Sequence, residues 1–131
     1  MEVKSLKNLE IKRITKGKLP SLPFVRIKEE ILGDKYDLSI SFVKKETIKD
    51  LSQQFKGDKT HQNILSFPLD KNSGEIILNL QTIRSEAKNF DKKYLNYLGF
   101  LVIHGMLHLK GFTHGSKMES EEKRLVKIFN L

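Results

Sequence analysis

The chain contains no cysteine, which excludes disulfide bonds and thiolate metal ligands. It also lacks an apolar run long enough to cross a bilayer, because the longest candidate, residues 97–103, is interrupted by Gly99 and followed by His104. The first twenty residues lack the apolar segment of a secretory signal. These absences fit a protein of the reducing cytoplasm that has no membrane partner.

Internal repeats and low-complexity tracts are absent as well, and the only proline-rich stretch is "GKLPSLP" at 17–23. The pieces on either side of this stretch are too short to be separate domains. A chain of 131 residues, of which 38% are hydrophobic, is large enough to bury a core without covalent cross-links. We therefore predict one domain over residues 1–131.

The charge is strongly one-sided. There are 24 Lys and Arg residues against 16 Asp and Glu residues, which gives a net charge of +8. Such a balance favours polyanionic partners, because basic side chains release counterions from phosphate groups. Many basic soluble proteins bind no nucleic acid, so the charge alone leaves both possibilities open.

Alternating apolar and polar residues predict strands. The clearest case is "YDLSISFV" at 36–43, in which Tyr36, Leu38, Ile40 and Phe42 point to one side. The other predicted strands are "VKSLKNLEI" at 3–11, "NILSFPLD" at 63–70 and "GEIILNLQ" at 74–81. The connection "DKNSG" makes the last two a hairpin.

Apolar residues at helical spacing predict five helices. They cover residues 24–33, 45–55, 82–90, 91–111 and the segment from Ser116 to the end. Ile48, Leu51 and Phe55 form the apolar face of the second, and Thr82 or Ser85 lies near the start of the third. Asp91 is the expected N-cap and Gly111 the expected end of the fourth, which is the longest. This order of elements favours an α+β domain with one mixed sheet of about four strands packed against helices.

The end of the longest helix carries three of the four histidines, in "HGMLHLKGFTH" at 104–114. His104 and His108 are four residues apart, so both imidazoles lie on one helical face, where they can bind one ion. Gly111 can adopt a positive φ, end the helix and turn the chain so that His114 approaches the same ion. We therefore predict one Zn²⁺ per chain, or another divalent ion, bound by three neutral imidazoles with an open fourth position.

A histidine-rich helix does not always hold a catalytic metal ion. A pair of histidines on an apolar helix can belong to a core, but a glycine break and a third histidine at this spacing favour a metal. A structural zinc site is normally closed by a fourth protein ligand, and the only other histidine, His61, lies in a polar loop where solvation is expected. The spacing also matches the long zincin signature H-E-x-x-H-x-x-G-x-x-H, yet Gly105 stands where those proteases have their general base.

The histidine segment closely resembles the H-G-x-L-H-L-x-G-[YF]-D-H signature of the YbeY family of bacterial endoribonucleases, also called rRNA maturation factors. "NILSFPLD" is similar to that family's T-D-V-L-S-F-P segment, "GEIILN" at 74–79 to its G-D-I-x-I strand, and "IRSEA" at 83–87 to the helix after it. The order and spacing agree from about residue 38 to the end.

The resemblance implies a metal-dependent endoribonuclease that cleaves single-stranded RNA in 16S rRNA maturation and ribosome quality control in the bacterial cytoplasm. It implies a compact α+β fold with His104, His108 and His114 as metal ligands. The implied partners are 16S rRNA and the ribosome, together with small-subunit ribosomal proteins or an assembly GTPase.

The chain departs from the family pattern at several positions. Lys56 stands where the family usually has an arginine, so the charge is kept while the planar fork that grips phosphate is lost. We expect Lys56 to stabilise the charge that builds up on a scissile phosphate. The family's Thr-Asp pair is Gln62-Asn63 here, and Thr113 replaces the aspartate before the third histidine.

The charged segment "SKMESEEKR" at 116–124 is expected to be a solvated helix face. Two other functions compete with the nuclease. One is a non-catalytic factor that binds rRNA or the ribosome and uses zinc as a structural pin. The other is a metalloprotease-like hydrolase, which Gly105 disfavours.

Overall fold

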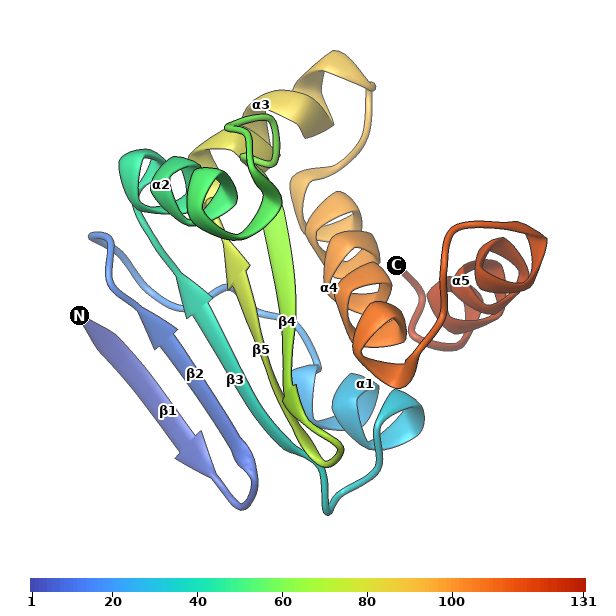
Figure 1. The fold of residues 1–131 in the computed structure, drawn as a ribbon. Coiled ribbons are helices and arrows are strands. Elements are labelled where there is room, and N and C mark those ends of the chain that lie inside the picture. The colour runs from blue at the N-terminus through green and yellow to red at the C-terminus, as the bar shows by residue number, and fades with distance from the viewer.

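Five strands form one mixed sheet in the computed structural model, which describes all residues 1–131 (Figure 1). Across the sheet their order is β1-β2-β3-β5-β4. Their bounds are β1 (Glu2–Leu6), β2 (Leu9–Arg13), β3 (Asp37–Phe42), β4 (Ile64–Asp70) and β5 (Ser73–Leu78). The central β2, β3 and β5 are parallel, and the edge strands β1 and β4 are antiparallel to their neighbours. The predicted α+β fold with a mixed sheet is confirmed.

The sheet has one strand more than the sequence suggested. The segment predicted as a single strand from residue 3 to residue 11 is a hairpin, in which Leu6 of β1 is paired with Leu9 of β2. The chain reverses through Lys7 and Asn8, and Asn8 has a φ of 60°. Asparagine is one of the few residues other than glycine that adopt this conformation readily, so a turn without glycine is easy to overlook.

All five predicted helices are present. They are α1 (Phe24–Ile31), α2 (Lys45–Lys56), α3 (Leu80–Asn89), α4 (Tyr94–Lys110) and α5 (Ser116–Ile128). Helices α1 and α4 cover one face of the sheet, α2 covers the other, and α5 packs against α4 on the side away from the strands (Figure 1). None of these helices has both the length and the apolar character needed to cross a membrane.

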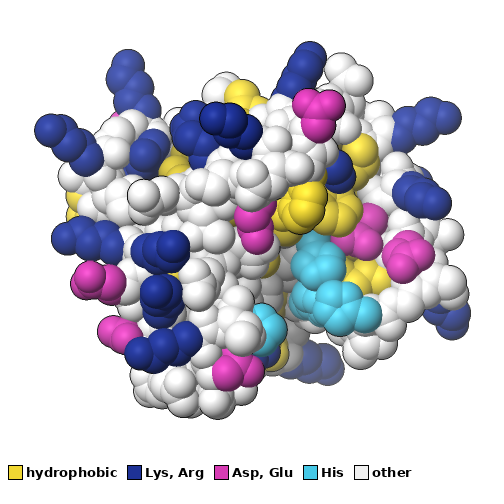
Figure 2. All heavy atoms as spheres, turned by 90° about the horizontal axis from the view of Figure 1, so that it is seen from above, with side chains coloured by type: hydrophobic (Ala, Val, Ile, Leu, Met, Phe, Trp, Pro, Cys, Tyr) yellow, Lys and Arg dark blue, Asp and Glu magenta, His cyan; other side chains and the backbone are white.

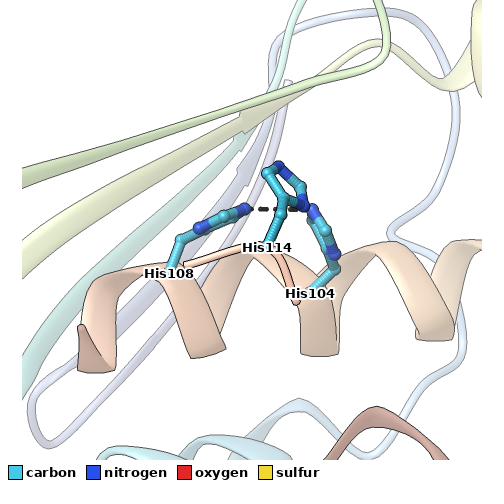
Figure 3. Close-up of side chains that lie close together, drawn as sticks. All are labelled: His104, His108 and His114. Carbon is cyan, nitrogen blue, oxygen red and sulfur yellow. Dashed lines mark hydrogen bonds between the residues drawn. The ribbon is translucent and has the colours of Figure 1, made fainter. Parts of the chain in front are cut away.

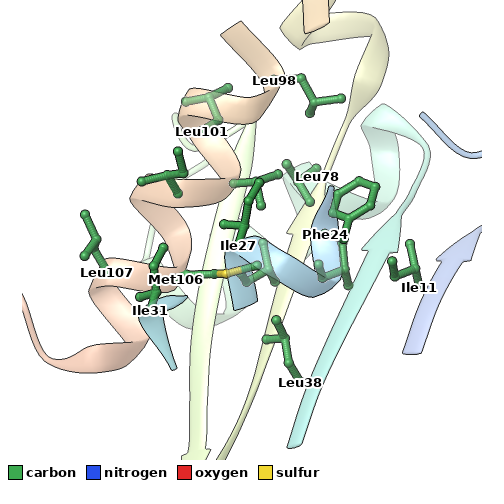
Figure 4. Close-up of a cluster of buried hydrophobic side chains, with 14 of the residues drawn as sticks. Ile11, Phe24, Ile27, Ile31, Leu38, Leu78, Leu98, Leu101, Met106 and Leu107 are labelled. Carbon is green, nitrogen blue, oxygen red and sulfur yellow. The ribbon is translucent and has the colours of Figure 1, made fainter. Parts of the chain in front are cut away.

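The main core lies between the sheet and the helices α1 and α4 (Figure 4). It also includes buried residues of α3 and, on the outer side of α4, of α5. Leu38, Ile40 and Phe42 of β3 point into it, as their alternation predicts. A second, smaller cluster of four buried residues lies under α2 on the opposite face. Phe55 has the predicted helical spacing, but it is 56% exposed, and its ring contacts Phe67.

Helix α4 is enclosed by other elements, because it contacts α1, α3, α5, β4 and β5. A helix in this position must be apolar on most of its circumference, which explains why all residues from Tyr97 to Ile103 except the half-buried Phe100 are buried. It ends at Gly111 in a left-handed conformation, as predicted. The predicted N-cap, Asp91, is wrong, because α4 begins at Tyr94 and Asp91 lies in the preceding turn with a φ of 53°.

Helix α3 begins earlier than predicted. Its N-cap is Asn79, whose side chain accepts a hydrogen bond from the Thr82 amide at 2.8 Å. The same side chain donates to the Val43 carbonyl at 2.9 Å and is 3% exposed. Asn79 therefore joins the ends of β3 and β5 to the start of α3. The sequence pattern assigned it to a strand and placed Thr82 or Ser85 at the helix start.

Replacing Asn79 with alanine should lower the free energy of unfolding by about 1–3 kcal/mol, because a helix cap is lost and the Val43 carbonyl is left without its partner. Urea denaturation followed by circular dichroism measures this change. Asn89→Ala at the exposed end of the same helix is the matched control and should change stability by less than about 0.5 kcal/mol. Equal effects of the two variants would contradict the assigned role of Asn79.

Candidate metal centre

The three histidines predicted as ligands converge in the structure (Figure 3). His104 and His108 project from α4, and His114 comes from the turn between α4 and α5. One potential ligand atom from each residue lies within 4.8 Å of the others. The Nε2 atoms of His104 and His108 are 3.1 Å apart, close to the separation of about 3.3 Å between two nitrogens on a tetrahedral zinc ion. The cluster can therefore bind a metal ion.

The outward-facing nitrogens of the two helical histidines are already fixed by hydrogen bonds. Nδ1 of His104 lies 2.8 Å from a carboxylate oxygen of Glu122, and Nδ1 of His108 lies 3.1 Å from the Phe112 carbonyl oxygen. Both oxygens accept, so each imidazole donates from Nδ1 and directs its Nε2 lone pair toward the common centre. Such outer partners set the tautomer and orientation of metal-binding histidines.

The surroundings of His108 favour its neutral imidazole. Burial, the neighbouring His104 and then His114 lower the pKa of His108 below its usual value. Because a metal ion binds only the deprotonated imidazole nitrogen, a lowered pKa keeps His108 available as a ligand at neutral pH.

The end of α4 brings the third histidine into place. Gly111 has a φ of 111°, and the amides of Gly111 and Phe112 donate to the carbonyls of His108 and Leu107. This closing arrangement turns the chain back, as the glycine predicted. It also fixes Phe112, which packs on the core and presents its carbonyl to His108. The helix break therefore supplies a third candidate ligand and orients the second.

Glu122 was missed in the sequence, where the segment 116–124 was expected to be a solvated face. That expectation is wrong for Glu122, which is 8% exposed, although most of its neighbours are exposed. Met118, Glu122 and Leu125 share the buried side of α5. A carboxylate at helical spacing between two apolar residues is the signal that was available, and only a partner such as His104 makes its burial tolerable.

Gly105 does more than leave the site without a carboxylate, because it also allows close packing of α4 on the sheet. A Cβ atom at this position would lie 2.9 Å from Cδ1 of Ile64 and 3.0 Å from Oγ of Ser66, both on β4. The side of α4 that carries Gly105 is thus pressed against the sheet. A glutamate at this position, as in the protease signature, would require the side chains of Ile64 and Ser66 to shift.

Facing the histidines is an open cleft of about 400 Å³ (Figure 2), here called the histidine cleft. It is lined by the three histidines, by Lys56, His61 and Asn63, and by residues 64–66 of β4. Lys56 is the last residue of α2, and His61 lies in the loop that follows. The structure therefore brings Lys56 to the same cavity as the histidines. His61 is exposed, as expected for a loop residue, and also borders the cleft.

The loop that carries His61 is held by Ser52, another residue that the sequence did not reveal. The Ser52 side chain is fully buried, and its hydroxyl donates to the Asp58 carbonyl at 2.7 Å and accepts from the His61 amide at 3.3 Å. Asn63 is fixed in turn, because its side-chain amide donates to Glu86 at 3.0 Å. The wall of the cleft opposite the histidines is thus anchored to α2 and α3.

Replacing Glu122 with glutamine should weaken metal binding about 10- to 100-fold, because the charged acceptor that orients His104 is lost. Competition with a chromophoric chelator for Zn²⁺ or Co²⁺ measures the affinity. The control Glu119→Gln changes an exposed carboxylate on the same helix and should leave the affinity within about twofold. Unchanged metal affinity in the Glu122 variant would show that the pair with His104 serves packing only.

Comparison with known proteins finds one family that matches nearly the entire chain. The family model described as Endoribonuclease YbeY matches residues 4–129. An Endoribonuclease YbeY of Campylobacter jejuni is 35% identical over 109 residues, covering 76% of this chain and 80% of the relative. Another, from Bacillus velezensis, is 28% identical over 116 residues, covering 77% of this chain and 73% of the relative. The solution structure of TM1509 from Thermotoga maritima superposes with a TM-score of 0.64 at 28% identity, covering 89% of this chain and 87% of that one.

Proposed function

Because this chain belongs to the endoribonuclease YbeY family, we propose that it hydrolyses phosphodiester bonds of single-stranded RNA in the histidine cleft, with a zinc ion bound by His104, His108 and His114. The observation that carries the proposal is the position of Lys56, which lines the same open cleft as the three histidines. A cation and a metal-binding cluster in one cavity suit a phosphate group between them.

The donor set supports zinc. Three imidazoles without a carboxylate or thiolate are a ligand set that zinc favours, and three protein ligands leave a position for reaction. A divalent ion in such a site polarises a phosphoryl oxygen and lowers the pKa of coordinated water toward ~7. The chain itself keeps the imidazoles oriented through Glu122 and the Phe112 carbonyl.

Lys56 is assigned the role of stabilising the negative charge that develops on the phosphate. Its ammonium is a point charge with three donors, so it needs no fixed bidentate geometry to act on a phosphoryl oxygen. In the cleavage step the nucleophile loses a proton and forms a new P–O bond, the P–O bond to the leaving sugar oxygen breaks, and that oxygen takes up a proton. The nucleophile is either water or the neighbouring ribose 2′-OH, and efficient cleavage of a DNA version of the substrate would exclude a required 2′-OH.

Removing the metal with a chelator should abolish RNA cleavage while the protein stays folded, because none of the three histidines belongs to the main hydrophobic core of 23 residues. Zinc restoration should recover activity. His108→Ala should lose both bound metal and cleavage, whereas His61→Ala should keep its metal. These results are measured by metal analysis, circular dichroism and gel assays of a labelled single strand.

The same experiment distinguishes the proposed nuclease from the alternative, a non-catalytic factor that zinc stabilises. If chelation unfolds the domain, zinc is a structural pin and the non-catalytic alternative gains support. If the metal-free, folded protein still cleaves RNA efficiently, the proposed mechanism is wrong.

Lys56→Ala should lower kcat about tenfold or more with the metal content unchanged, because a cation near the developing charge is removed. Lys56→Arg keeps the charge and adds a planar fork, so it should retain activity or exceed the wild type. Lys59→Ala removes an exposed charge from the loop after α2 and is the matched control. Steady-state kinetics on a short single-stranded RNA decide the matter, and equal kcat values for all variants would remove Lys56 from the mechanism.

We further propose that the natural substrate is 16S rRNA on the cytoplasmic ribosome. The resemblance of the motifs and the net charge of +8 support this assignment. Small-subunit ribosomal proteins or an assembly GTPase are the proposed protein partners. Binding of the purified protein to small ribosomal subunits, compared with its binding to free RNA of the same length, tests this part independently of cleavage.

A further inference from the structure

A second group of basic side chains lies at the end of the sheet where β2, β3 and β5 finish. Arg13 closes β2, Lys44 and Lys45 follow β3 at the start of α2, and Arg84 projects from α3. Together they line a hollow of about 340 Å³, here called the cationic pocket. Parallel strands end at one edge of a sheet, so three segments distant in sequence deliver their charges to one place.

These four charges have no acidic partner. The other side chains that line the hollow are neutral, and none of the four makes a salt bridge. Like charges gathered without a carboxylate repel one another, and an anionic ligand relieves that repulsion. The arrangement therefore fits the binding of phosphate groups better than it fits a structural role.

The two arginines are held in position. Nε of Arg13 donates to the Thr15 hydroxyl at 3.1 Å, and its guanidinium also contacts the Lys18 carbonyl. The Arg84 guanidinium lies over the Tyr94 ring, 4.0 Å from the centroid. An ordered guanidinium loses less conformational entropy on binding, and the donors that Arg13 does not use in these contacts can still bind phosphate oxygens. The pocket is thus organised before any ligand arrives.

The cationic pocket adjoins the histidine cleft. The amide of Asn79, which lines the pocket, donates to the carbonyl of Asn63, which lines the cleft, at 3.0 Å. Helix α2 connects them as well, because it begins with Lys45 at the pocket and ends with Lys56 at the cleft. Its length places these two Cα atoms roughly 16 Å apart. If a stacked single strand keeps the spacing of about 3.4 Å per nucleotide that one strand has in a duplex, it covers that distance in about five nucleotides.

We propose that the cationic pocket is a second RNA-binding site, which holds backbone phosphates of the same single strand about five nucleotides from the phosphodiester in the histidine cleft. This inference rests on the proposed function, since it names where the remainder of the substrate binds. The contacts are with phosphate groups, so the pocket adds affinity and fixes the direction of the strand without reading its sequence.

The test uses the full-length, metal-free protein and fluorescently labelled single-stranded RNAs of four and twelve nucleotides. Anisotropy gives the affinities, and no cleavage is needed. For the wild type, the twelve-nucleotide RNA should bind more than tenfold more tightly than the four-nucleotide RNA. In the triple variant Lys44→Gln, Lys45→Gln, Arg84→Gln this gain should shrink to less than threefold. The slope of log affinity against log salt should fall by about 2, because three phosphate contacts are lost.

A matched control removes the same charge from the opposite end of the sheet. Lys7, Lys35 and Lys71 are exposed and precede β2, β3 and β5. Their replacement by glutamine should leave the affinity for both RNAs within about twofold. The double variant Lys44→Gln, Lys45→Gln leaves the stacking of Arg84 on Tyr94 intact. It therefore controls for a folding defect caused by the loss of Arg84. It should show an intermediate loss at an unchanged Tm.

Several outcomes overturn the proposal. One is an unchanged affinity of the triple variant for the twelve-nucleotide RNA. Another is an equal loss of RNA affinity in the control variant. A third is that inorganic phosphate or a mononucleotide binds at the pocket without changing the affinity for RNA. If the wild type binds the long RNA through the pocket but cleaves nothing, the proposed function fails while this inference stands.

Discussion

Helix α4 lies against β4 with no side chain between them at position 105, and the rest of the site depends on this close approach. Gly105 allows the helix to pack so tightly that a Cβ atom would meet Ile64 and Ser66. The neighbouring His104 is then held at the rim of the sheet, beside the edge strand that lines the histidine cleft. The same close packing disfavours the carboxylate that the zincin proteases carry at this position, because neighbouring side chains would have to shift. Gly105 therefore affects both the packing of α4 on β4 and the set of chemical groups available at the metal centre.

The candidate metal centre is assembled from parts that differ in burial. Helix α4 is enclosed on most sides and carries His104 and His108 on a half-buried stripe. Helix α5 contributes Glu122, whose buried carboxylate is compensated by its hydrogen bond with His104. By contrast, His114 and Lys56 are exposed. A rigid, partly buried pair of imidazoles beside exposed groups suits a site that must hold an ion firmly and still admit a long polymer.

Helix α2 connects the two regions where basic side chains and an open cavity coincide. Its C-terminal end delivers Lys56 to the histidine cleft, and its N-terminal end delivers Lys45 to the cationic pocket. Buried Ile48 and Ser52 anchor the helix on its face of the sheet. The spacing between the cavities is consequently a property of the fold, set by a helix of fixed rise per residue. The fold thus arranges basic side chains along a line from the cationic pocket to the histidine cleft, which the composition alone does not show.

Features that depend on neighbours along the chain can be predicted from the amino-acid sequence. Alternation in β3, the apolar spacing of the helices, the pairing of His104 with His108 and the break at Gly111 are local patterns, and the structure follows them. Tertiary structure decided the rest, because contacts between distant segments leave no local trace. The hydrogen bond of Asn79 to Val43, the pair of Glu122 with His104 and the gathering of Arg13 and Arg84 in one pocket arise from strands and helices that come together only in the folded chain. The hairpin turn at Asn8 is local instead, and it lacks the glycine that would mark it in the sequence. Position 105 illustrates the difference: the sequence shows that a carboxylate is missing there, and only the packing of α4 on β4 shows that a side chain at this position would displace its neighbours.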